Sequence, residues 1–290
     1  MAFRNIIIDS RCKLEYSMNY LICRKGLDEK KILLDEIKLI VINSTQCSIT
    51  TTLISECLKK KIKIIFSDQQ HNPCGELVPY KNNYYSYRKI KEQMAISEDN
   101  KQQLWTLVVK NKIYYQMKNL ELSGKTREAT MLENYLSSIE LNDKTNCEGI
   151  AAKVYFQALF GKEFSRDLVC KENMYLDYGY SIILATFNRV IRSIGYFTEL
   201  GIHHIGESNS FNFSCDLMEP LRPLVDNYVI SGYVNDDNYR YEFVNMLTKE
   251  VRYDDHKTFL DNAIEEYVEN AVLALKTGFM NRCKFIEYEL

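Results

Sequence analysis

Short apolar runs separated by turn residues mark the first eighty positions of the chain. These runs are "FRNIIID", "CKLEYSM", "NYLICRKG", "KKILLDEIKLIVIN" and "IKIIFSD", with turn residues at positions 9–10, 26 and 43–44. Because they are rich in β-branched and aromatic residues, they predict β-strands. Before the last run, "TTTLISECLKKK" places Leu53, Cys57 and Leu58 on one helical stripe and ends in lysines that suit a helix C-terminus. We expect a compact β-rich domain over residues 1–80 that carries one helix.

A helical period replaces this pattern after residue 80. Apolar side chains recur at helical spacing from Leu104 to Leu120, and again over 128–141, 148–160, 176–200 and 258–276. Four glycines stand where helices would end: Gly124, Gly161, Gly201 and Gly278. Residues 81–90, "KNNYYSYRKI", are polar and predict a linker. The predicted fold class is therefore α+β with two domains, the second being an all-helical domain over residues 91–290.

The composition excludes several classes of protein. The chain has 290 residues, of which 46% are hydrophobic and 26% charged, so it can form one large domain or two ordinary ones. No apolar run approaches the roughly 18 residues that a membrane span needs, and no signal-peptide core stands near the start. The nine cysteines are scattered without a C-x-x-C pair, which predicts reduced thiols. We expect a cytoplasmic protein that does not associate with membranes.

The net charge of −2 hides an uneven distribution of charge along the chain. Residues 81–127 carry 10 Lys and Arg against 4 Asp and Glu, whereas residues 128–290 carry 15 against 26. A basic region can bind phosphates while an acidic region binds a metal ion. Solvated helix faces would give the same counts. Charge alone leaves both interpretations open.

Candidate chemistry gathers in the segment "GIHHIGESNSFNFSCDLMEPLRPLVD", residues 201–226. Asp216 and Glu219 are three residues apart, which places both carboxylates on one face of a helix. Arg222 extends this face and could hold a phosphate through two hydrogen bonds. With a histidine from "GIHH", such carboxylates could hold a metal ion for phosphodiester chemistry. The alternative is a capping box, with Asp216 as the N-cap and Glu219 at the third helical position.

Other candidates have equally ordinary alternatives. Glu148 opens "EGIAAKVYFQALFG", where an acid in a first helical turn is favoured by the helix dipole as well as being a candidate metal ligand. The 21 tyrosines could stack on bases or fill a core. None of the patterns G-x-x-x-x-G-K-[ST], G-x-G-x-x-G and G-x-S-x-G occurs in the sequence. Nucleotide-binding loops and acyl hydrolysis are therefore not indicated.

Four blocks in this order resemble the Cas1 family, the CRISPR-associated integrases that capture new spacers: "CEGIAAKVYFQALFGKEFSRD", "NMYLDYGYSIILATFNRVIRSIG", "GIHH" and "FNFSCDLMEPLRPLVD". The length, the opening "RNIIIDSRCKLEYSMNYLI" and the stretch "MEPLRPLVD" are most similar to the type II-A branch. The resemblance covers essentially the whole chain. It implies a small N-terminal β-sandwich-like dimerisation domain, followed by a larger helical catalytic domain that binds metal and DNA.

The resemblance also implies an activity, a cofactor and partners. The family members are divalent-metal-dependent DNA endonucleases and integrases of antiviral defence, in which 3′-hydroxyls of prespacer DNA attack a phosphodiester of the CRISPR repeat. Magnesium or manganese is the expected cofactor. The implied assembly contains two homodimers bridged by a Cas2 dimer. In the type II-A branch, Cas9 and a small DNA-sliding accessory protein are further partners.

Matching positions in the family give the expected metal ligands. The resemblance implies that Glu148, His204 and Glu219 bind the metal ion. Asp216 matches the family's other acidic position. The resemblance implies that this side chain supports the metal ligands without binding the metal itself. His203 matches no ligand position, so we expect it not to bind the metal.

The expected DNA contacts are less direct, because the chain departs from the family pattern here. Many relatives have a basic residue shortly after the histidine, whereas Glu207 and Ser208 stand there in this chain. The source of local phosphate contacts must therefore lie elsewhere. The nearest basic candidates in the sequence are Lys153, Arg166 and Arg222.

Two other functions are compatible with these residues. A structure-selective, metal-dependent DNA nuclease would use the same ligands and would cut DNA without integrating it. A catalytically silent nucleic-acid-binding scaffold would rely on the tyrosines and on the basic stretch 81–127 instead. The presence of all three ligand positions favours an enzyme.

Overall fold

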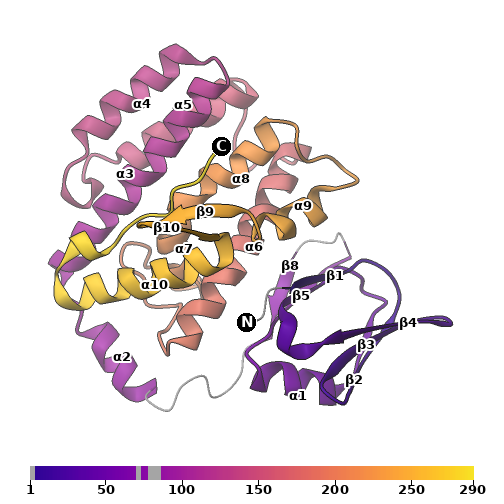
Figure 1. The fold of residues 1–290 in the computed structure, drawn as a ribbon. Coiled ribbons are helices and arrows are strands. Elements are labelled where there is room, and N and C mark those ends of the chain that lie inside the picture. Colours follow the sequence, from indigo (N-terminus) through magenta and orange to yellow (C-terminus); the bar gives the residue numbers. More distant parts are fainter. Residues whose placement is uncertain (1–3, 70–72, 78–85) are drawn as a thin grey trace. The chain divides into compact units, whose positions relative to one another are not determined.

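The chain divides into two compact units, Met1–Asn82 and Asn83–Leu290. The computed structural model describes residues 4–69, 73–77 and 86–290. Strands dominate the first unit and helices the second, so the fold mixes α and β structure in the predicted order (Figure 1). Within the predicted linker 81–90, residues 81–85 lie outside the described residues. The remaining five form the start of helix α2 (Ser86–Met94).

Two four-stranded sheets and one helix form the first unit. The sheet of order β1-β5-β7-β8 contains β1 (Arg4–Ile8), β5 (Ile37–Ile42), β7 (Lys63–Ser67) and β8 (Pro73–Glu76). The sheet of order β4-β3-β2-β6 contains β4 (Asp28–Leu33), β3 (Tyr20–Lys25), β2 (Lys13–Ser17) and β6 (Ser48–Ile49). The predicted helix is α1 (Thr51–Lys59), and the Thr50 side chain accepts a hydrogen bond from the Leu53 N–H at its start.

One hydrophobic core joins both sheets to α1. Leu21 of one sheet, Ile40 of the other and Leu53 of the helix belong to the same cluster of buried side chains. The prediction of a single strand through "KKILLDEIKLIVIN" is wrong, because the 3₁₀ turn η1 (Leu34–Glu36) divides it into β4 and β5. Leu34 is buried in the core at this turn, so the apolar run continues while the chain passes from one sheet to the other.

Nine helices of the described residues build the second unit: α2, α3 (Glu98–Leu122), α4 (Thr126–Ser138), α5 (Cys147–Phe160), α6 (Lys171–Ser193), α7 (Asn212–Met218), α8 (Arg222–Ile230), α9 (Tyr239–Met246) and α10 (Leu260–Thr277). Short 3₁₀ turns lie between some of these helices, η2 (Leu141–Asp143) and η3 (Glu219–Leu221), and a further one, η4 (Met280–Arg282), follows α10. The longest helix, α3, is capped by Ser97, whose side chain accepts a hydrogen bond from the Asn100 N–H. Because α3 packs against α4, α5, α8 and α10, its side chains reach the interior of the unit (Figure 1).

The prediction of an all-helical second domain is wrong in one place. Strands β9 (Glu250–Tyr253) and β10 (His256–Phe259) form an antiparallel hairpin before α10. Val251 and Tyr253 are buried and alternate with exposed charged residues, which is the period of a strand and not of a helix. Asp254 adopts a positive φ of 51° in the connecting turn.

Three of the four predicted helix-ending glycines follow helices in left-handed conformations. Gly124, Gly161 and Gly278 have φ values of 71°, 103° and 75°. The prediction for Gly201 is wrong, because α6 ends earlier and Gly195, with φ of 86°, follows it. Gly201 serves the candidate site instead.

Two expectations from composition concern cysteines and membrane spans. Each of the nine cysteines is a free thiol in the structure. Over residues 4–69, 73–77 and 86–290, no helix has both the length and the apolar character required to cross a membrane.

Candidate active site

Glu148 stands in the first turn of α5, and neighbouring side chains fix that turn. The carboxylate of Asp143 accepts the N–H of Cys147 at 2.8 Å and the N–H of Glu148 at 2.9 Å. Asn146 is the N-cap residue of the helix and caps a further N–H. These N–H groups have no partner within the helix, so the caps hold the first turn in place. The Glu148 carboxylate forms an ion pair with Lys112 of α3.

Glu219 begins η3 and is held there by two cations. It is 5% exposed. Lys112 donates a hydrogen bond to its Oε2 at 2.5 Å, and the Nε–H of Arg222 donates to its Oε1 at 2.7 Å. Burial by itself would raise the pKa of Glu219, but the charges of Arg222 and Lys112 outweigh burial and lower the pKa to about 2. Glu219 is therefore ionised at neutral pH.

Lys112 joins the two glutamates, and sequence reasoning missed it. Its ammonium donates to both Glu148 and Glu219, although the residue is only 6% exposed. Burial would lower the pKa of Lys112, but the two carboxylates outweigh burial and raise the pKa above its ordinary value. From the sequence, Lys112 was counted only as one cation of the basic stretch 81–127. The available signal was a lysine between Val109 and Ile113 on an apolar helical stripe, where an ammonium requires a buried carboxylate.

Asp216 builds the histidine loop. It is fully buried within α7, and its Oδ2 accepts the backbone N–H of Ile202 at 2.6 Å and that of His203 at 3.0 Å. Its Oδ1 accepts the backbone N–H of His204 at 3.1 Å and lies 2.5 Å from Nδ1 of the His204 ring. The capping-box alternative is wrong, because Asp216 lies inside a helix and Glu219 begins a separate 3₁₀ turn.

Gly201 allows this loop to close on Asp216. A Cβ atom at position 201 would lie 2.2 Å from the backbone oxygen of His204 and 2.8 Å from Oδ2 of Asp216. The Asp216 oxygen accepts the backbone N–H groups of Ile202 and His203, so it cannot retreat without breaking these hydrogen bonds. The glycine is required by a close approach and not by a helix end.

The two adjacent histidines have different environments. The His203 ring stacks on Trp105 with ring centroids 4.1 Å apart, and burial lowers its pKa. The hydrogen bond to Asp216 raises the pKa of His204 against the effect of burial, and the charges of Asp216, Glu219 and Glu148 add to the increase. The side chain of His204 is 45% exposed. Both histidines are exposed, and His204 is the one whose ring is held by Asp216 and on which the charges of both Glu219 and Glu148 act.

The expected ligands lie close enough to share an electrostatic environment, but they do not form a ready-made metal shell. In the described part of the chain, no group of three or more His, Cys, Asp or Glu side chains is placed to hold a metal ion. The ammonium of Lys112 stands between Glu148 and Glu219, and it bonds the carboxylate oxygens that a metal ion would need.

The three expected DNA contacts do not share one environment. The Nε–H of Arg222 is used by Glu219, and its guanidinium lies 4.6 Å from the centroid of the Tyr180 ring. Arg166 lies 5.3 Å from the same ring and pairs with Asp177. Lys153 is exposed on α5. Two of the three cations therefore meet at Tyr180 beside the site, and the third lies on the surface.

Several cations of the basic stretch 81–127 are engaged with acids of the same helix. The pairs are Arg88–Glu92, Lys101–Glu98 and Lys118–Glu121. Such exposed pairs exchange readily with other anions, because each contributes only about 0–1 kcal/mol. Lys112 does not add to the surface charge of this stretch, because it is buried.

A cavity of about 490 Å³ lies beside His204. Its wall combines the end of α2, Lys101 of α3 and the loop that carries the histidines. Apolar side chains such as Ile205 and Phe213 alternate there with the polar groups of Asn209 and Asn212. His204 is itself among the residues that line this cavity.

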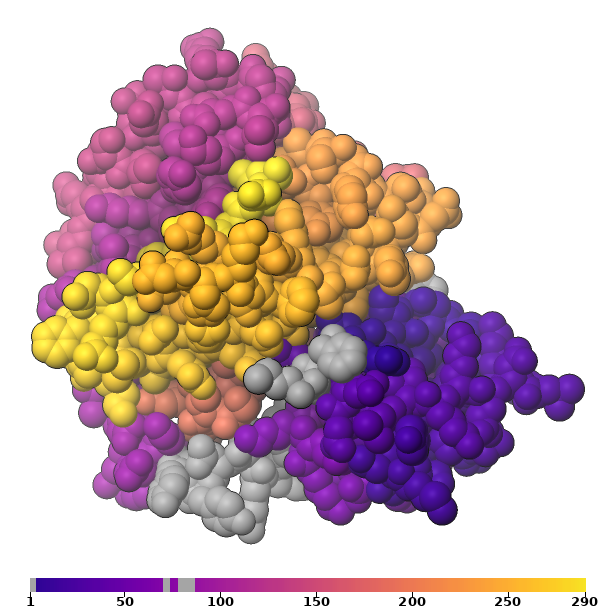
Figure 2. All heavy atoms as spheres, in the orientation of Figure 1, coloured from indigo at the N-terminus to yellow at the C-terminus, as the bar shows by residue number. Residues whose placement is uncertain are grey.

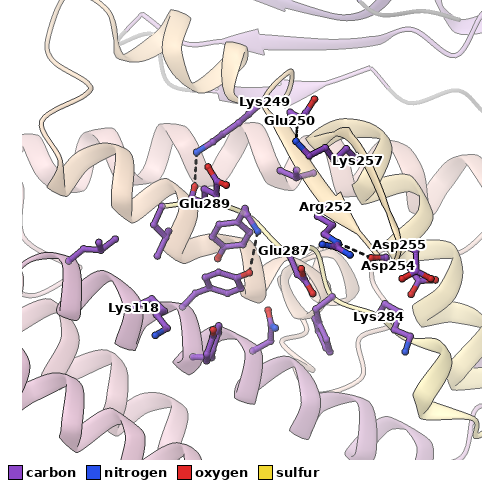
Figure 3. A pocket seen from close by; sticks show the side chains of 18 of the residues that line it. Lys118, Lys249, Glu250, Arg252, Asp254, Asp255, Lys257, Lys284, Glu287 and Glu289 are labelled. Atoms are coloured by element: carbon purple, nitrogen blue, oxygen red, sulfur yellow. Dashed lines mark hydrogen bonds and ion pairs between the residues drawn. The ribbon is translucent and has the colours of Figure 1, made fainter.

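A larger cavity of about 1560 Å³ lies between α3, the β9–β10 hairpin and the last residues of the chain (Figure 3). Figure 2 shows those residues in yellow between the magenta helices and the orange segments. The lining mixes both signs of charge, and pairs such as Lys257–Glu250 lie within it. This mixed lining does not favour a polyanion. The hydroxyl of Tyr288, which lines this cavity, donates a hydrogen bond to the Pro220 carbonyl at 2.8 Å. This hydrogen bond connects the cavity wall to the residue that follows Glu219.

The chain consists of a strand-rich unit followed by a helical unit. In the helical unit, carboxylates, a histidine and buried cations lie together in one site, and this combination defines the class of protein. The chain matches the family description "CRISPR associated protein Cas1" over residues 6–256. It is 33% identical over 233 residues to "CRISPR-associated endonuclease Cas1" of Neisseria meningitidis serogroup C (strain 8013), covering 80% of this chain and 77% of that protein. The chain belongs to the Cas1 family.

Solved structures share this fold at lower sequence identity. A Cas1 protein from Thermotoga maritima has a TM-score of 0.73 at 16% identity, over 94% of this chain and 97% of that chain. A casposase bound to an integration product has a TM-score of 0.75 at 17% identity, over 95% and 91%. A Cas6-RT-Cas1–Cas2 complex has a TM-score of 0.78 at 17% identity, over 99% of this chain and 36% of that longer one.

Proposed function

We propose that this chain is a divalent-metal-dependent DNA integrase of CRISPR adaptation, of the type II-A branch. It would join the 3′-hydroxyls of prespacer DNA to phosphodiesters of the CRISPR array. One observation carries the proposal. Two glutamates from distant helical segments converge on a single cationic group, beside a histidine whose ring is held by a buried carboxylate.

The chemistry of these residues fits a divalent ion. Glu148 and Glu219 already bond one shared cationic group. Asp216 holds Nδ1 of His204, which leaves Nε2 free for coordination, as is usual for metal-binding histidines. Glu148, Glu219 and His204 would hold magnesium, which suits carboxylate oxygens, or manganese, which also accepts imidazole. When bound, the ion neutralises charge on the phosphate and lowers the pKa of the attacking hydroxyl.

The surrounding residues prepare this site. Asp216 accepts a hydrogen bond from Nδ1–H and thereby fixes the tautomer in which Nε2 of His204 carries the lone pair. Arg222 keeps Glu219 ionised and orients its carboxylate. The cavity beside His204 admits a DNA strand, and exposed cations such as Lys153 contact its phosphates. Arg166 and the free edge of Arg222 add positive charge beside the site.

The proposed assembly follows the family and its relatives. The β-rich unit would form a homodimer, and a Cas2 dimer would bridge two such dimers across which prespacer DNA lies. A solved relative is named as a Cas1–Cas2 complex, which supports Cas2 as a partner. Cas9 and the DNA-sliding accessory protein would complete a cytoplasmic adaptation complex. Light scattering should give a dimer at micromolar concentration, and a monomer alone would remove this part of the proposal.

A nuclease that cuts branched DNA without integrating it would use the same three ligands. The relative from Neisseria is named an endonuclease, which keeps this second function in view. One assay separates the possibilities: labelled prespacer DNA and a supercoiled repeat plasmid are mixed with the protein and divalent metal, with and without Cas2. Label joined to the plasmid supports the integrase. Cleavage without joining supports the nuclease, and binding without either supports the scaffold.

A further inference from the structure

Lys112 is buried, so its charge does not contribute to the protein surface. It lies on the buried side of α3 and is 6% exposed. An unpaired ammonium in such a place would pay a large desolvation penalty, so its position depends on the carboxylates around it. Those carboxylates are Glu148 and Glu219, the two that the proposed function assigns to metal binding.

The same two carboxylate oxygens face one position. Oε1 of Glu148 and Oε2 of Glu219 both accept hydrogen bonds from the single nitrogen of Lys112. With Arg222 bound to the other oxygen of Glu219, the cluster contains two negative and two positive side chains and is neutral. A divalent ion added between the glutamates would leave two uncompensated positive charges if the ammonium stayed. Electrostatics therefore opposes simultaneous occupation.

We propose that the Lys112 ammonium and the divalent ion exchange for one position between Glu148 and Glu219. This inference rests on the proposed function of the site. Without metal, the ammonium keeps two buried carboxylates together that would otherwise repel each other. With metal, the ammonium is displaced from them. Lys112 thus weakens the affinity for metal and stabilises the metal-free protein.

The test compares Lys112→Met with Lys118→Met, the same substitution at an exposed position of the same helix. Free Mn²⁺ is measured by electron paramagnetic resonance in titrations without DNA, and melting temperatures are recorded with and without saturating Mn²⁺. Lys112→Met should bind Mn²⁺ about tenfold more tightly or better, since a competitor is removed. Its metal-free melting temperature should fall, and Mn²⁺ should raise it more than in the parent. Lys118→Met should resemble the parent.

Two further variants keep the outcome decisive. Lys112→Gln also removes the charge but keeps a hydrogen-bond donor, and it should show the same tighter binding if Lys112→Met fails to fold. Unchanged or weaker Mn²⁺ binding in a folded Lys112 variant overturns the exchange. Glu219→Gln should lose Mn²⁺ binding. If instead it binds Mn²⁺ like the parent, the proposed metal site itself is wrong, whatever the Lys112 variants show.

Discussion

Asp216 and Glu219 lie three residues apart and are both buried, yet they belong to two differently built halves of the site. The loop half consists of residues 201–204 and Asp216, whose carboxylate takes three backbone N–H groups and the His204 ring. The glutamate half consists of Glu148, Glu219, Lys112 and Arg222, in which side chains of opposite charge hold one another.

The two halves therefore have different roles: the loop half positions His204, and the glutamate half takes part in the chemistry. Backbone donors cannot leave Asp216 without opening the loop, so the loop half is a fixed frame for His204. Side-chain cations can leave a carboxylate when another cation replaces them, so the glutamate half can change partners. Loss of Asp216 should therefore cost mainly stability, and loss of a glutamate should cost mainly chemistry.

The largest expected effect is on strand transfer in the glutamate half. Glu148→Ala and Glu219→Gln should reduce strand transfer to background, because each removes a carboxylate expected to bind the metal ion. Dimer formation and most DNA binding should survive, as measured by light scattering and by fluorescence anisotropy. His203→Ala is the control and should stay active. A fully active Glu219→Gln protein would show that strand transfer does not require the glutamate half.

In the loop half, Asp216→Ala should act mainly on stability. It leaves three buried N–H groups without their charged acceptor, which should lower the free energy of unfolding by about 3 kcal/mol or more. Metal affinity should fall by about 10- to 100-fold, because His204 loses its orienting partner. Urea denaturation and a Mn²⁺ titration measure the two effects. A stable Asp216→Ala protein that keeps the metal affinity of the parent would show that the loop does not depend on this carboxylate.

Gly201→Ala should strain the same half from the backbone. The added Cβ meets the His204 carbonyl at 2.2 Å, so the loop must shift, at a cost of about 1–3 kcal/mol. Gly206→Ala is the matched control, since its nearest neighbour would lie at 3.6 Å. Thermal melting of both variants decides the point, and equal melting temperatures would contradict the close approach.

The pH dependence should report the link between the halves. The pKa of His204 is raised above its ordinary value in the metal-free protein, and protonation of the ring competes with metal binding, so strand transfer should decline as pH falls. The stabilising contribution of protonated His204 is fully present below 6.5 and is lost as pH rises through the folded-state pKa. Asp216→Asn should move the acidic limb of the rate profile downward. If the acidic limb of the profile does not move, a group other than His204 causes the decline in rate.

The smallest expected effect concerns DNA binding away from both halves. Lys153→Glu should weaken binding of any DNA sequence and reduce the salt slope by about one, because one phosphate contact is lost. Lys118→Glu is the comparison, since Lys118 already pairs with Glu121 and lines the mixed-charge cavity. Equal effects of both variants on anisotropy titrations would remove Lys153 from the DNA path.

Local patterns predicted much of the fold, because strands and helices bury periodic apolar faces. They failed where an apolar run served two sheets, at Leu34, and where a short alternation at Val251 and Tyr253 was absorbed into a helical region. For the site, the spacing of Asp216 and Glu219 fitted a cap as well as a metal site. Only tertiary contacts distinguish them.

Lys112 shows most clearly what sequence reasoning could not reach. Its partners come from α5 and η3, far along the chain, and nothing local indicates that they meet. Gly201 is similar, since its close neighbours are fixed by the loop that it allows to form. The ligand positions came from family resemblance, whereas these supporting roles come from packing.

The most direct test of the central claim is anomalous diffraction at the manganese edge from crystals of the protein grown with Mn²⁺. We expect one strong peak bound by carboxylate oxygens of Glu148 and Glu219 and by Nε2 of His204, with the Lys112 ammonium moved away. A peak held by other residues, or no peak at saturating Mn²⁺ with Lys112 still between the glutamates, would contradict it.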